Sequence, residues 1–249
     1  MRRTIYVLFG LCLATAVAGQ QPGWRNSDLT DPIEILKKVD AAAKAVKSVK
    51  YKITFKGSGA AESRAPNVEG TVFMSGWSNG APQKFRCEAK IKRPGSSEVV
   101  EITVGSDGED FYVVDHKAKK AYVDIDPEVM GTTGRPAMLL RVGEFLHPSP
   151  FSDEINSEAQ ELKGSKKIGG EDCYEVRVSY GRRGREAIWH FSKKDFLPRA
   201  RLDLFTTPSG EKGGQQRTIT DLVVDPKFDK DSFKFRLPKG YTRTDDFAP

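Results

Sequence analysis

Residues 189–202 read WHFSKKDFLPRARL, and this stretch decides the fold. An apolar run ends in a charged turn around Asp195, and a second run leaves the turn through Pro198. That pattern is typical of two antiparallel strands joined by a short connection. Residues 221–228 (DLVVDPKF) and 233–241 (FKFRLPKGY) predict one more strand, a short loop and a final apolar strand closed by Pro and Gly.

The N-terminal half opens with a helix signal and then changes to strand periodicity. Asp31 is a good N-cap, Pro32 fits the first helical position, and apolar residues recur at helical spacing until about Ser48. Strict alternation follows, with apolar residues from Val49 to Phe55 on one face and lysines on the other. We expect an amphipathic helix whose apolar face covers a sheet.

Short strands separated by turns that contain Gly or Pro fill most of the chain. Strands this close in sequence are antiparallel neighbours, because a parallel return needs a long crossover. We expect strands at residues 49–56, 70–78, 84–92, 98–104, 110–115, 121–124, 161–167, 173–180, 186–191, 199–206, 217–224 and 233–237. A second amphipathic helix is expected over residues 135–146, opened by Pro136, with another helical turn before Gln160.

This pattern predicts a mainly β fold of the α+β class. A single antiparallel sheet of about 11 strands accumulates twist and curls toward a barrel. A curl wider than about eight strands leaves more space than its own side chains fill. We therefore expect a half-open barrel in which the helices cover the concave side and a hollow remains for a ligand.

Apolar residues on the strand faces are the candidate ligand site. The expected cavity lining is Tyr51, Ile53, Phe55, Val72, Met74, Phe85, Ile102, Val104, Trp189, Phe191, Leu202 and Leu204. The expected lid is Met138, Leu139, Val142, Phe145 and Phe151. For any one of these residues the alternative is an ordinary filled core, and the sequence does not show which face of each strand is concave.

The N-terminus carries the features of an export signal. Arg2 and Arg3 precede an apolar run over residues 5–18, and small residues around Ala18 fit a cleavage site. An uncleaved membrane anchor would need roughly 18 or more apolar residues. We expect cleavage after residue 18, a flexible lead-in over residues 19–30, and export to the periplasm or cell envelope of a bacterium.

Charge and the chemical groups exclude several classes of function. The net charge of +6 is interspersed along solvated strand faces, which is not the pattern of a nucleic-acid groove. The three histidines, His116, His147 and His190, lack the spacing of metal ligands, so we expect no metal site. No nucleophile motif or phosphate loop is present, so we expect neither an enzyme nor a cofactor.

Two cysteines, Cys87 and Cys173, remain after the expected cleavage. In an oxidising compartment they could form a disulfide bond, provided that their α-carbons lie within about 7 Å of each other. The alternative is a pair of buried thiols that pack as small hydrophobic residues. The sequence leaves both open.

Over residues 31–241 the chain resembles the LolA/LolB-type superfamily of periplasmic lipoprotein carriers, which includes the N-terminal domain of the RseB-type sensors. The resemblance rests on the opening helix with its strand, on residues 170–176 (GEDCYEV), on residues 189–204, and on the ending 221–240. It is greatest to the outer-membrane lipoprotein-sorting-like branch. It implies an incomplete barrel, helices that plug one mouth and acyl chains bound inside. The lipid-gating arginine of the carriers has no match by motif here, and we assign none.

These observations predict a non-enzymatic envelope protein that holds a lipid, a lipoprotein acyl chain or another apolar ligand in a half-open barrel. The alternative is an envelope-stress sensor or protein-interaction module of the RseB type. The expected partners are lipid or acyl chains and a membrane protein, with no nucleic acid, and we expect a monomer. Residues 242–249 are expected to form a C-terminal tail.

Overall fold

The computed structural model describes residues 28–76, 84–124, 126, 131–181 and 184–244. Its helices are α1 (Pro32–Ala45), α2 (Gly131–Met138), the 3-10 helix η2 (Gly143–Leu146) and α3 (Ser152–Ile155). Its strands are β1 (Ser48–Gly59), β2 (Asn67–Ser75), β3 (Lys84–Lys92), β4 (Val99–Ser106), β5 (Phe111–Asp115), β6 (Lys120–Asp124), β7 (Ala159–Ile168), β8 (Glu171–Ser179), β9 (Glu186–Ser192), β10 (Pro198–Thr206), β11 (Lys212–Val224) and β12 (Thr242–Arg243).

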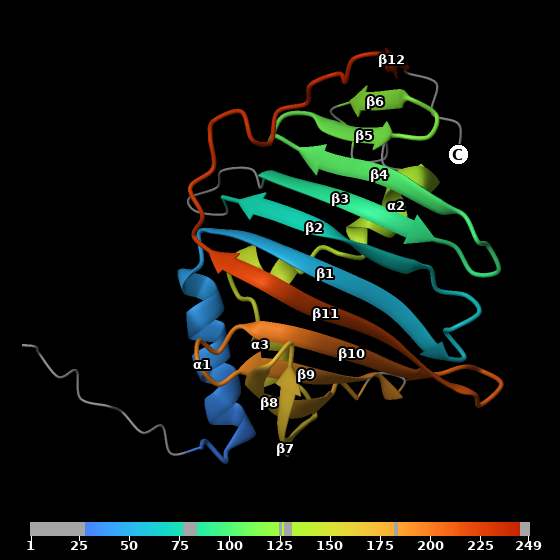
Figure 1. The fold of residues 1–249 in the computed structure, drawn as a ribbon. Coiled ribbons are helices and arrows are strands. Elements are labelled where there is room, and N and C mark those ends of the chain that lie inside the picture. The colour runs from blue at the N-terminus through green and yellow to red at the C-terminus, as the bar shows by residue number, and fades with distance from the viewer. Residues whose placement is uncertain (1–27, 77–83, 125, 127–130, 182–183, 245–249) are drawn as a thin grey trace, which may run out of the picture.

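All of these strands join one open, curved sheet of 12 strands (Figure 1). The order is β12-β6-β5-β4-β3-β2-β1-β11-β10-β9-β8-β7, so two meanders meet where β1 pairs with β11. Every pairing is antiparallel except that of β12 with β6. The predicted class is confirmed, because a curved antiparallel sheet stays open and α2 lies behind β3 and β4, on its concave side.

Helix α1 forms as its end signals predict. The Asp31 carboxylate accepts the N–H of Ile33 at 2.9 Å, and Pro32 occupies the first turn. The buried face carries Ile35, Leu36, Val39 and Ala43, which join the main core. The helix ends at Ala45, slightly before the expected position, because the next residue already has extended backbone.

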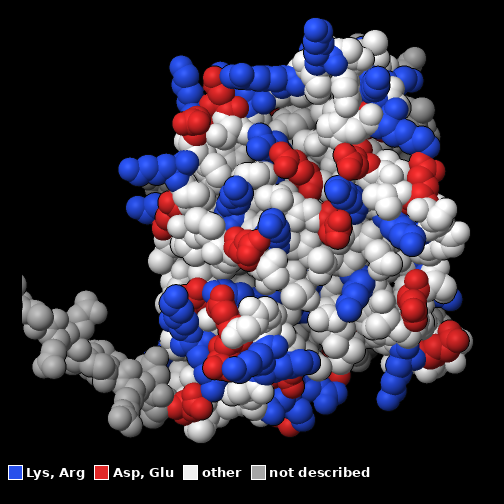
Figure 2. Space-filling view, viewed as in Figure 1, with Lys and Arg blue, Asp and Glu red and all other residues white. Residues whose placement is uncertain are grey.

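Alternation along β1 separates the two faces of the sheet. Tyr51, Ile53 and Phe55 are buried in the core, while the lysines between them are exposed. Figure 2 shows the outer face, on which basic and acidic side chains are interspersed. One such contact is the ion pair between Lys52 and Asp221, at 2.8 Å on exposed side chains. Pairs of this kind contribute little to stability, so the inner face holds the fold together.

The predicted helix over residues 135–146 is broken into two pieces. Helix α2 ends at Met138, and η2 begins only at Gly143. Between them the backbone turns inward and bonds to side chains of the sheet. The extra helical turn expected before Gln160 is present as α3.

The predicted strand at residues 233–237 is wrong. This segment instead crosses the outer face as irregular chain, and the final strand is the short β12, parallel to β6. Two side chains of the sheet bond to the backbone where this segment begins: Tyr112 donates to Phe233 O at 3.2 Å, and Arg86 donates to the carbonyl of the preceding Ser232 at 2.8 Å. The Phe235 ring packs on Tyr112, with centroids 5.4 Å apart. Aromatic packing therefore replaces strand pairing here.

Cys87 and Cys173 are both free, buried thiols. Five strands separate β3 from β8 in the sheet order, which explains why the two do not meet. Burial raises the pKa of Cys87 to about 12 and that of Cys173 to about 11. Of the two arrangements left open by the sequence, the structure has the unpaired one.

Among the described residues, no helix is long and apolar enough to cross a membrane. The expected signal peptide (residues 1–18), most of the lead-in and residues 245–249 of the expected tail lie outside the described residues. So do the last two residues of the strand expected at 70–78.

Candidate functional site

The concave face of β1–β4, together with β9, is apolar and filled. Ten of the predicted lining residues lie there and are almost fully buried: Tyr51, Ile53, Phe55, Val72, Met74, Phe85, Ile102, Val104, Trp189 and Phe191. They pack against side chains that the chain itself supplies from residues 137–151. The structure thus brings these residues together in one core, and the space they enclose is occupied by protein.

Leu202 and Leu204, the other two predicted lining residues, lie on the opposite face of the sheet from these ten. Trp189 pairs with Arg201 across β9 and β10, so Arg201 shares the concave face. Leu202 pairs with Ile188 on the opposite face, and Leu204 alternates with it, although Leu204 also borders the neighbouring cavity. The cause is a register shift of one residue between Pro198 and Ala200, which moves every later side chain of β10 to the other face.

The predicted lid is an inserted plug, which we define as residues 139–151. Its Phe145 ring lies 5.4 Å from the ring of Tyr51, and Phe151 packs edge-on against Trp189 at 5.3 Å. Val142 is also buried, and Leu139 is partly buried, as is Met138 just before the plug. Leu140, which the sequence analysis missed, is fully buried.

Side chains of the sheet and of α1 hold the backbone of the plug. The hydroxyl of Tyr51 accepts the N–H of Val142 at 2.9 Å and donates to Leu140 O at 3.3 Å. Arg217 donates from Nε to Leu139 O at 2.9 Å. Asp40 of α1 accepts the N–H of Phe151 at 3.3 Å. The plug is therefore bound much as a separate peptide would be.

Beside the plug the concave face is hollow and charged. A cavity of about 1060 Å³ lies between residues 141–158 and strands β9–β11. Its charged and polar wall includes Arg141, Glu144, Asp153, Glu154, Tyr180, Arg185, Arg201, Asp203, Gln215 and Arg217. We call this space the charged cavity. Of the predicted lining residues, only Trp189 and Leu204 border it.

Two arginines form the floor of the charged cavity. Arg201 and Arg217 are directly opposite each other on β10 and β11. Each lies over an aromatic ring: Arg201 is 4.6 Å from the centre of Trp189, and Arg217 is 5.3 Å from the centre of Phe55. Like charges in opposed positions repel, so this arrangement needs carboxylates nearby.

Two carboxylates offset the repulsion between Arg201 and Arg217, one from the sheet and one from the plug. Asp203 bridges the arginines, at 2.7 Å from Arg201 Nε and 3.0 Å from Arg217 Nη1. Glu144 of the plug pairs with Arg201 Nη1 at 3.0 Å. The Arg201 and Glu144 side chains are about a fifth exposed, so water screens the pair only partly.

Glu154 and Tyr180 form the deepest polar contact of the charged cavity. The Tyr180 hydroxyl donates to Glu154 at 2.8 Å. Burial raises the pKa of Glu154, and the bond from Tyr180 opposes that shift. In the same wall the buried indole N–H of Trp189 makes no hydrogen bond of ordinary geometry within the described chain. This N–H lies close enough to Tyr180 to lower the pKa of its hydroxyl. The wall of the charged cavity therefore holds an indole donor with at most a weak partner.

No protein-family model matches the chain, and no curated protein sequence matches it. Solved structures do match. MucB is 14% identical with a TM-score of 0.51, covering 83% of this chain and 63% of its own. LprF from Mycobacterium bovis is 10% identical with a TM-score of 0.50, covering 86% of this chain and 100% of its own. A LolA superfamily protein from Nitrosomonas europaea is 14% identical with a TM-score of 0.34, covering 83% of this chain and 99% of its own.

The chain shares the fold of MucB and LprF. Within this fold it spans somewhat under two thirds of the length of MucB. The likeness concerns the architecture alone, at identities this low.

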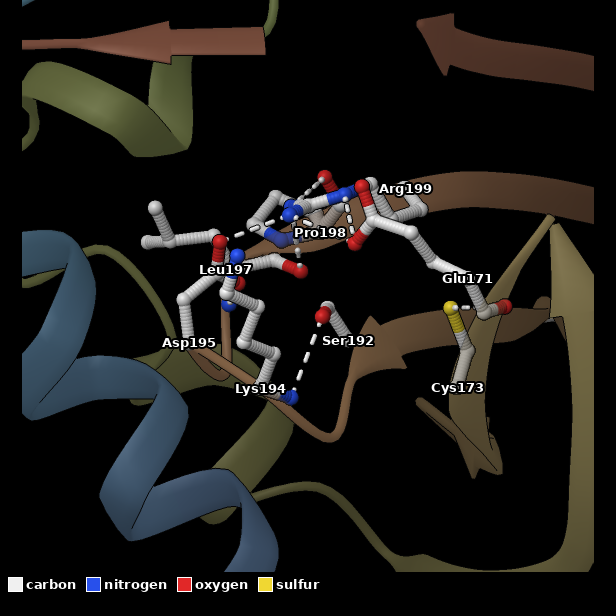
Figure 3. Close-up of polar contacts among 8 residues, drawn as sticks. All are labelled: Glu171, Cys173, Ser192, Lys194, Asp195, Leu197, Pro198 and Arg199. Carbon is white, nitrogen blue, oxygen red and sulfur yellow. Dashed lines mark hydrogen bonds and ion pairs between the residues drawn. The ribbon is translucent and has the colours of Figure 1, made fainter. Parts of the chain in front are cut away.

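A second polar cluster lies at the β9–β10 turn (Figure 3). The buried Arg199 pairs with Asp195 at 2.6 Å and donates to Glu171 at 3.0 Å. It also donates to the carbonyl of Leu197 at 3.2 Å. Cys173 donates from Sγ to the carbonyl of Glu171 at 3.6 Å. These contacts fasten the turn to β8, and we read the cluster as structural.

Two of the histidines, His116 just after β5 and His190 on β9, serve as hydrogen-bonding groups. His116 lies 2.9 Å from Thr103 Oγ1 and 3.0 Å from the hydroxyl of Tyr241. His190 lies 2.8 Å from Glu175, and burial lowers its pKa. Within the described part of the chain, no group of three His, Cys, Asp or Glu side chains is placed to hold a metal ion.

The residues of the charged cavity were not predicted from the sequence. The alternation in RARLDLF (199–205) favours leucines inside and charges outside, which is the reverse of the structure on β10. The one feature of the sequence that points to a bulge is Pro198 at the start of the strand, because proline has no backbone N–H to donate to the neighbouring strand. A bulge there would have exchanged the two faces.

Proposed function

We propose that the chain is a non-enzymatic binding protein that holds the apolar part of a lipid or lipoprotein acyl chain on the concave face of its sheet. One observation carries this proposal: the apolar concave face is covered by a plug whose backbone is bonded to side chains of the sheet and of α1. Phe145 and Phe151 stand where an acyl chain would lie. Withdrawal of the plug would expose a continuous apolar surface without disturbing the strand pairing.

The free energy lost when the plug side chains are exposed is similar to the free energy gained when an acyl chain is buried. Exposing Leu140, Phe145, Leu146 and Phe151 costs roughly 1.5–3 kcal/mol for each side chain, or roughly 6–12 kcal/mol together. Burying an acyl chain of about 14 methylenes contributes about 0.8 kcal/mol for each, or about 11 kcal/mol in all. Near balance makes loading reversible, as a carrier requires.

The remaining expectations belong to the same proposal. We propose that residues 1–18 direct export, that residues 31–241 form the binding domain, and that the chain acts as a monomer in the bacterial envelope. We assign no reaction to the chain, because the charged cavity carries paired arginines and carboxylates with no activated nucleophile among the described residues.

Uptake of a fluorescent fatty acid tests the proposal. Cis-parinaric acid should bind the purified chain and accept energy transfer from its tryptophans, of which Trp189 lies in the core beneath the plug. Phe151→Ala should raise uptake, because it weakens the plug at its contacts with Trp189 and Phe191. Phe228→Ala, which removes a ring packed on Phe73 outside the main core, is the matched control. No uptake by either the wild type or Phe151→Ala would refute lipid binding.

A second function is favoured by the way in which the plug is held. Tyr51 and Arg217 recognise backbone groups, which any extended peptide also presents. MucB, which shares the fold, has been solved in complex with MucA. The chain could then be an interaction module for a membrane protein. Capture of one stoichiometric membrane protein by delipidated chain, with no fatty-acid uptake, would favour this function over lipid binding.

A further inference from the structure

The segment over the charged cavity is acidic, and we call its residues 143–158 the cover. Residues 143–158 (GEFLHPSPFSDEINSE) contain four acidic residues and no lysine or arginine, in a chain whose net charge is +6. The strand side of the charged cavity supplies Arg201 and Arg217 together with Asp203 and Glu186, and Arg141 of the plug also lines it. The cover brings a further carboxylate, Glu144, to the two opposed arginines of the floor, where it pairs with Arg201.

Within the cover, the carboxylate of Glu144 lies in the charged cavity, whereas the apolar side chains that follow it lie in the core. Glu144 reaches Arg201 at 3.0 Å, while its neighbour Phe145 is fully buried against Tyr51. Leu146 continues the apolar run and is also buried. A negative group on Arg201, joined directly to an apolar group in the core, is the geometry that an anionic amphiphile would adopt.

The arginines are suited to exchange that carboxylate for another anion. Guanidinium groups bind carboxylate and phosphate oxygens with matched geometry, and each arginine of the floor lies over an aromatic ring. Asp203 belongs to the sheet and stays when the plug leaves, but it cannot compensate both charges alone. The buried indole N–H of Trp189, in the same wall, offers a further donor to an incoming oxygen.

We propose that the plug imitates the ligand, and that the ligand is an anionic amphiphile whose carboxylate or phosphate takes the place of Glu144 on Arg201. This inference rests on the proposed function and adds the chemistry of the polar end. The acyl chain replaces Phe145 and Leu146 in the core, and the anion replaces Glu144 at the floor of the charged cavity. Binding of the head group and release of the plug are then one event.

The test compares three probes on the full exported chain by isothermal titration calorimetry. Oleate carries a carboxylate, monoolein carries the same acyl chain with a neutral head, and inorganic phosphate carries the anion alone. Oleate should bind at least about tenfold more tightly than monoolein, the effect expected of a lost charge-assisted hydrogen bond. Phosphate alone should bind weakly or not at all, because it cannot replace the buried side chains of the plug.

Two variants and their controls locate the effect. Arg201→Gln should reduce oleate affinity about tenfold and leave monoolein affinity within about twofold. Glu144→Gln should strengthen oleate binding several-fold, because it removes the competing carboxylate. Arg236→Gln, which removes an exposed arginine paired with Asp231, and Glu161→Gln, which removes an exposed glutamate, should change neither affinity.

Different failures point to different errors. Equal affinity for oleate and monoolein, unchanged by Glu144→Gln, would overturn the anionic ligand and leave lipid binding intact. Tight binding of phosphate alone would also overturn it, in favour of a site for a free anion. Absence of binding by either lipid, in wild type and Phe151→Ala alike, would overturn the inference together with the proposed function. Glu144→Gln keeps the test valid should Arg201→Gln fail to fold.

Discussion

The hydroxyl of Tyr51 accepts the N–H of Val142 at 2.9 Å, in the fully buried centre of the molecule. The same hydroxyl donates to the carbonyl of Leu140. One side chain of the sheet thus satisfies two backbone groups of the plug that have no helix to satisfy them. Burial raises the pKa of Tyr51 well above its ordinary value, so the hydroxyl keeps its proton throughout the physiological range.

Replacement of this tyrosine tests how the plug is held. Tyr51→Phe leaves the Val142 N–H buried without a partner, which costs about 1–3 kcal/mol of unfolding free energy. It should also increase fatty-acid uptake, because the plug leaves more readily. Chemical denaturation and parinaric acid titration measure the two effects. Tyr112→Phe, which removes a bond to Phe233 on the outer segment, should destabilise the chain without changing uptake.

Truncation inside the plug should be rescued by ligand. Phe145→Ala removes a fully buried ring and should lower the free energy of unfolding by about 3–5 kcal/mol. Oleate should stabilise Phe145→Ala more than it stabilises the wild type, because its acyl chain fills the space that the ring leaves. Thermal unfolding with and without oleate gives the comparison. An identical shift in both proteins would mean that ligand and Phe145 do not share a site.

Glu154 should make stability depend on pH. Burial raises its pKa in the folded state above that in the unfolded chain. The folded state therefore holds the proton more tightly, and this contribution to stability is lost as pH rises from about 4.3 through the raised pKa. Glu154→Gln should lose less stability over this range while keeping an acceptor for Tyr180.

Denaturation midpoints measured between pH 4 and pH 8 give this result directly. Glu161→Gln, at an exposed position on β7, serves as the control and should follow the wild type. Parallel pH profiles for wild type and Glu154→Gln would show that the buried carboxyl does not titrate in this range.

The two cysteines should resist thiol reagents. Cys87 and Cys173 are buried, and their raised pKa values leave almost no thiolate at pH 8. Iodoacetamide should label neither in the native chain and both after unfolding without reductant, as peptide mass spectrometry would show. A peptide pair linked through Cys87 and Cys173 would contradict the free thiols.

Local sequence patterns predicted the helices and strands well where residues close together in the sequence decide the structure. The cap at Asp31 set the start of α1, and the alternation from Val49 to Phe55 gave the buried face of β1. The open curved sheet followed from the number of short strands, because twist accumulates whatever the side chains are.

The errors arose where contacts distant in sequence decide the structure. A single bulge between Pro198 and Ala200 reversed the faces of β10, so that Arg201 entered the concave side in place of Leu202. Residues 233–237 alternate like a strand, yet Tyr112 bonds to the carbonyl of Phe233 and Arg86 to that of the preceding Ser232. The hollow was expected to be apolar, but the plug fills the apolar part and the space that remains is charged.

The most direct test of the central claim is hydrogen exchange of the plug with and without bound oleate. The free chain should protect the amide of Val142, which bonds to the buried Tyr51. Saturation with oleate should speed exchange across residues 139–151 while the strands β1 and β11 keep their protection. If oleate binds and protection of the plug is unchanged or greater, the ligand does not replace the plug, and the claim that the two compete for the concave face is wrong.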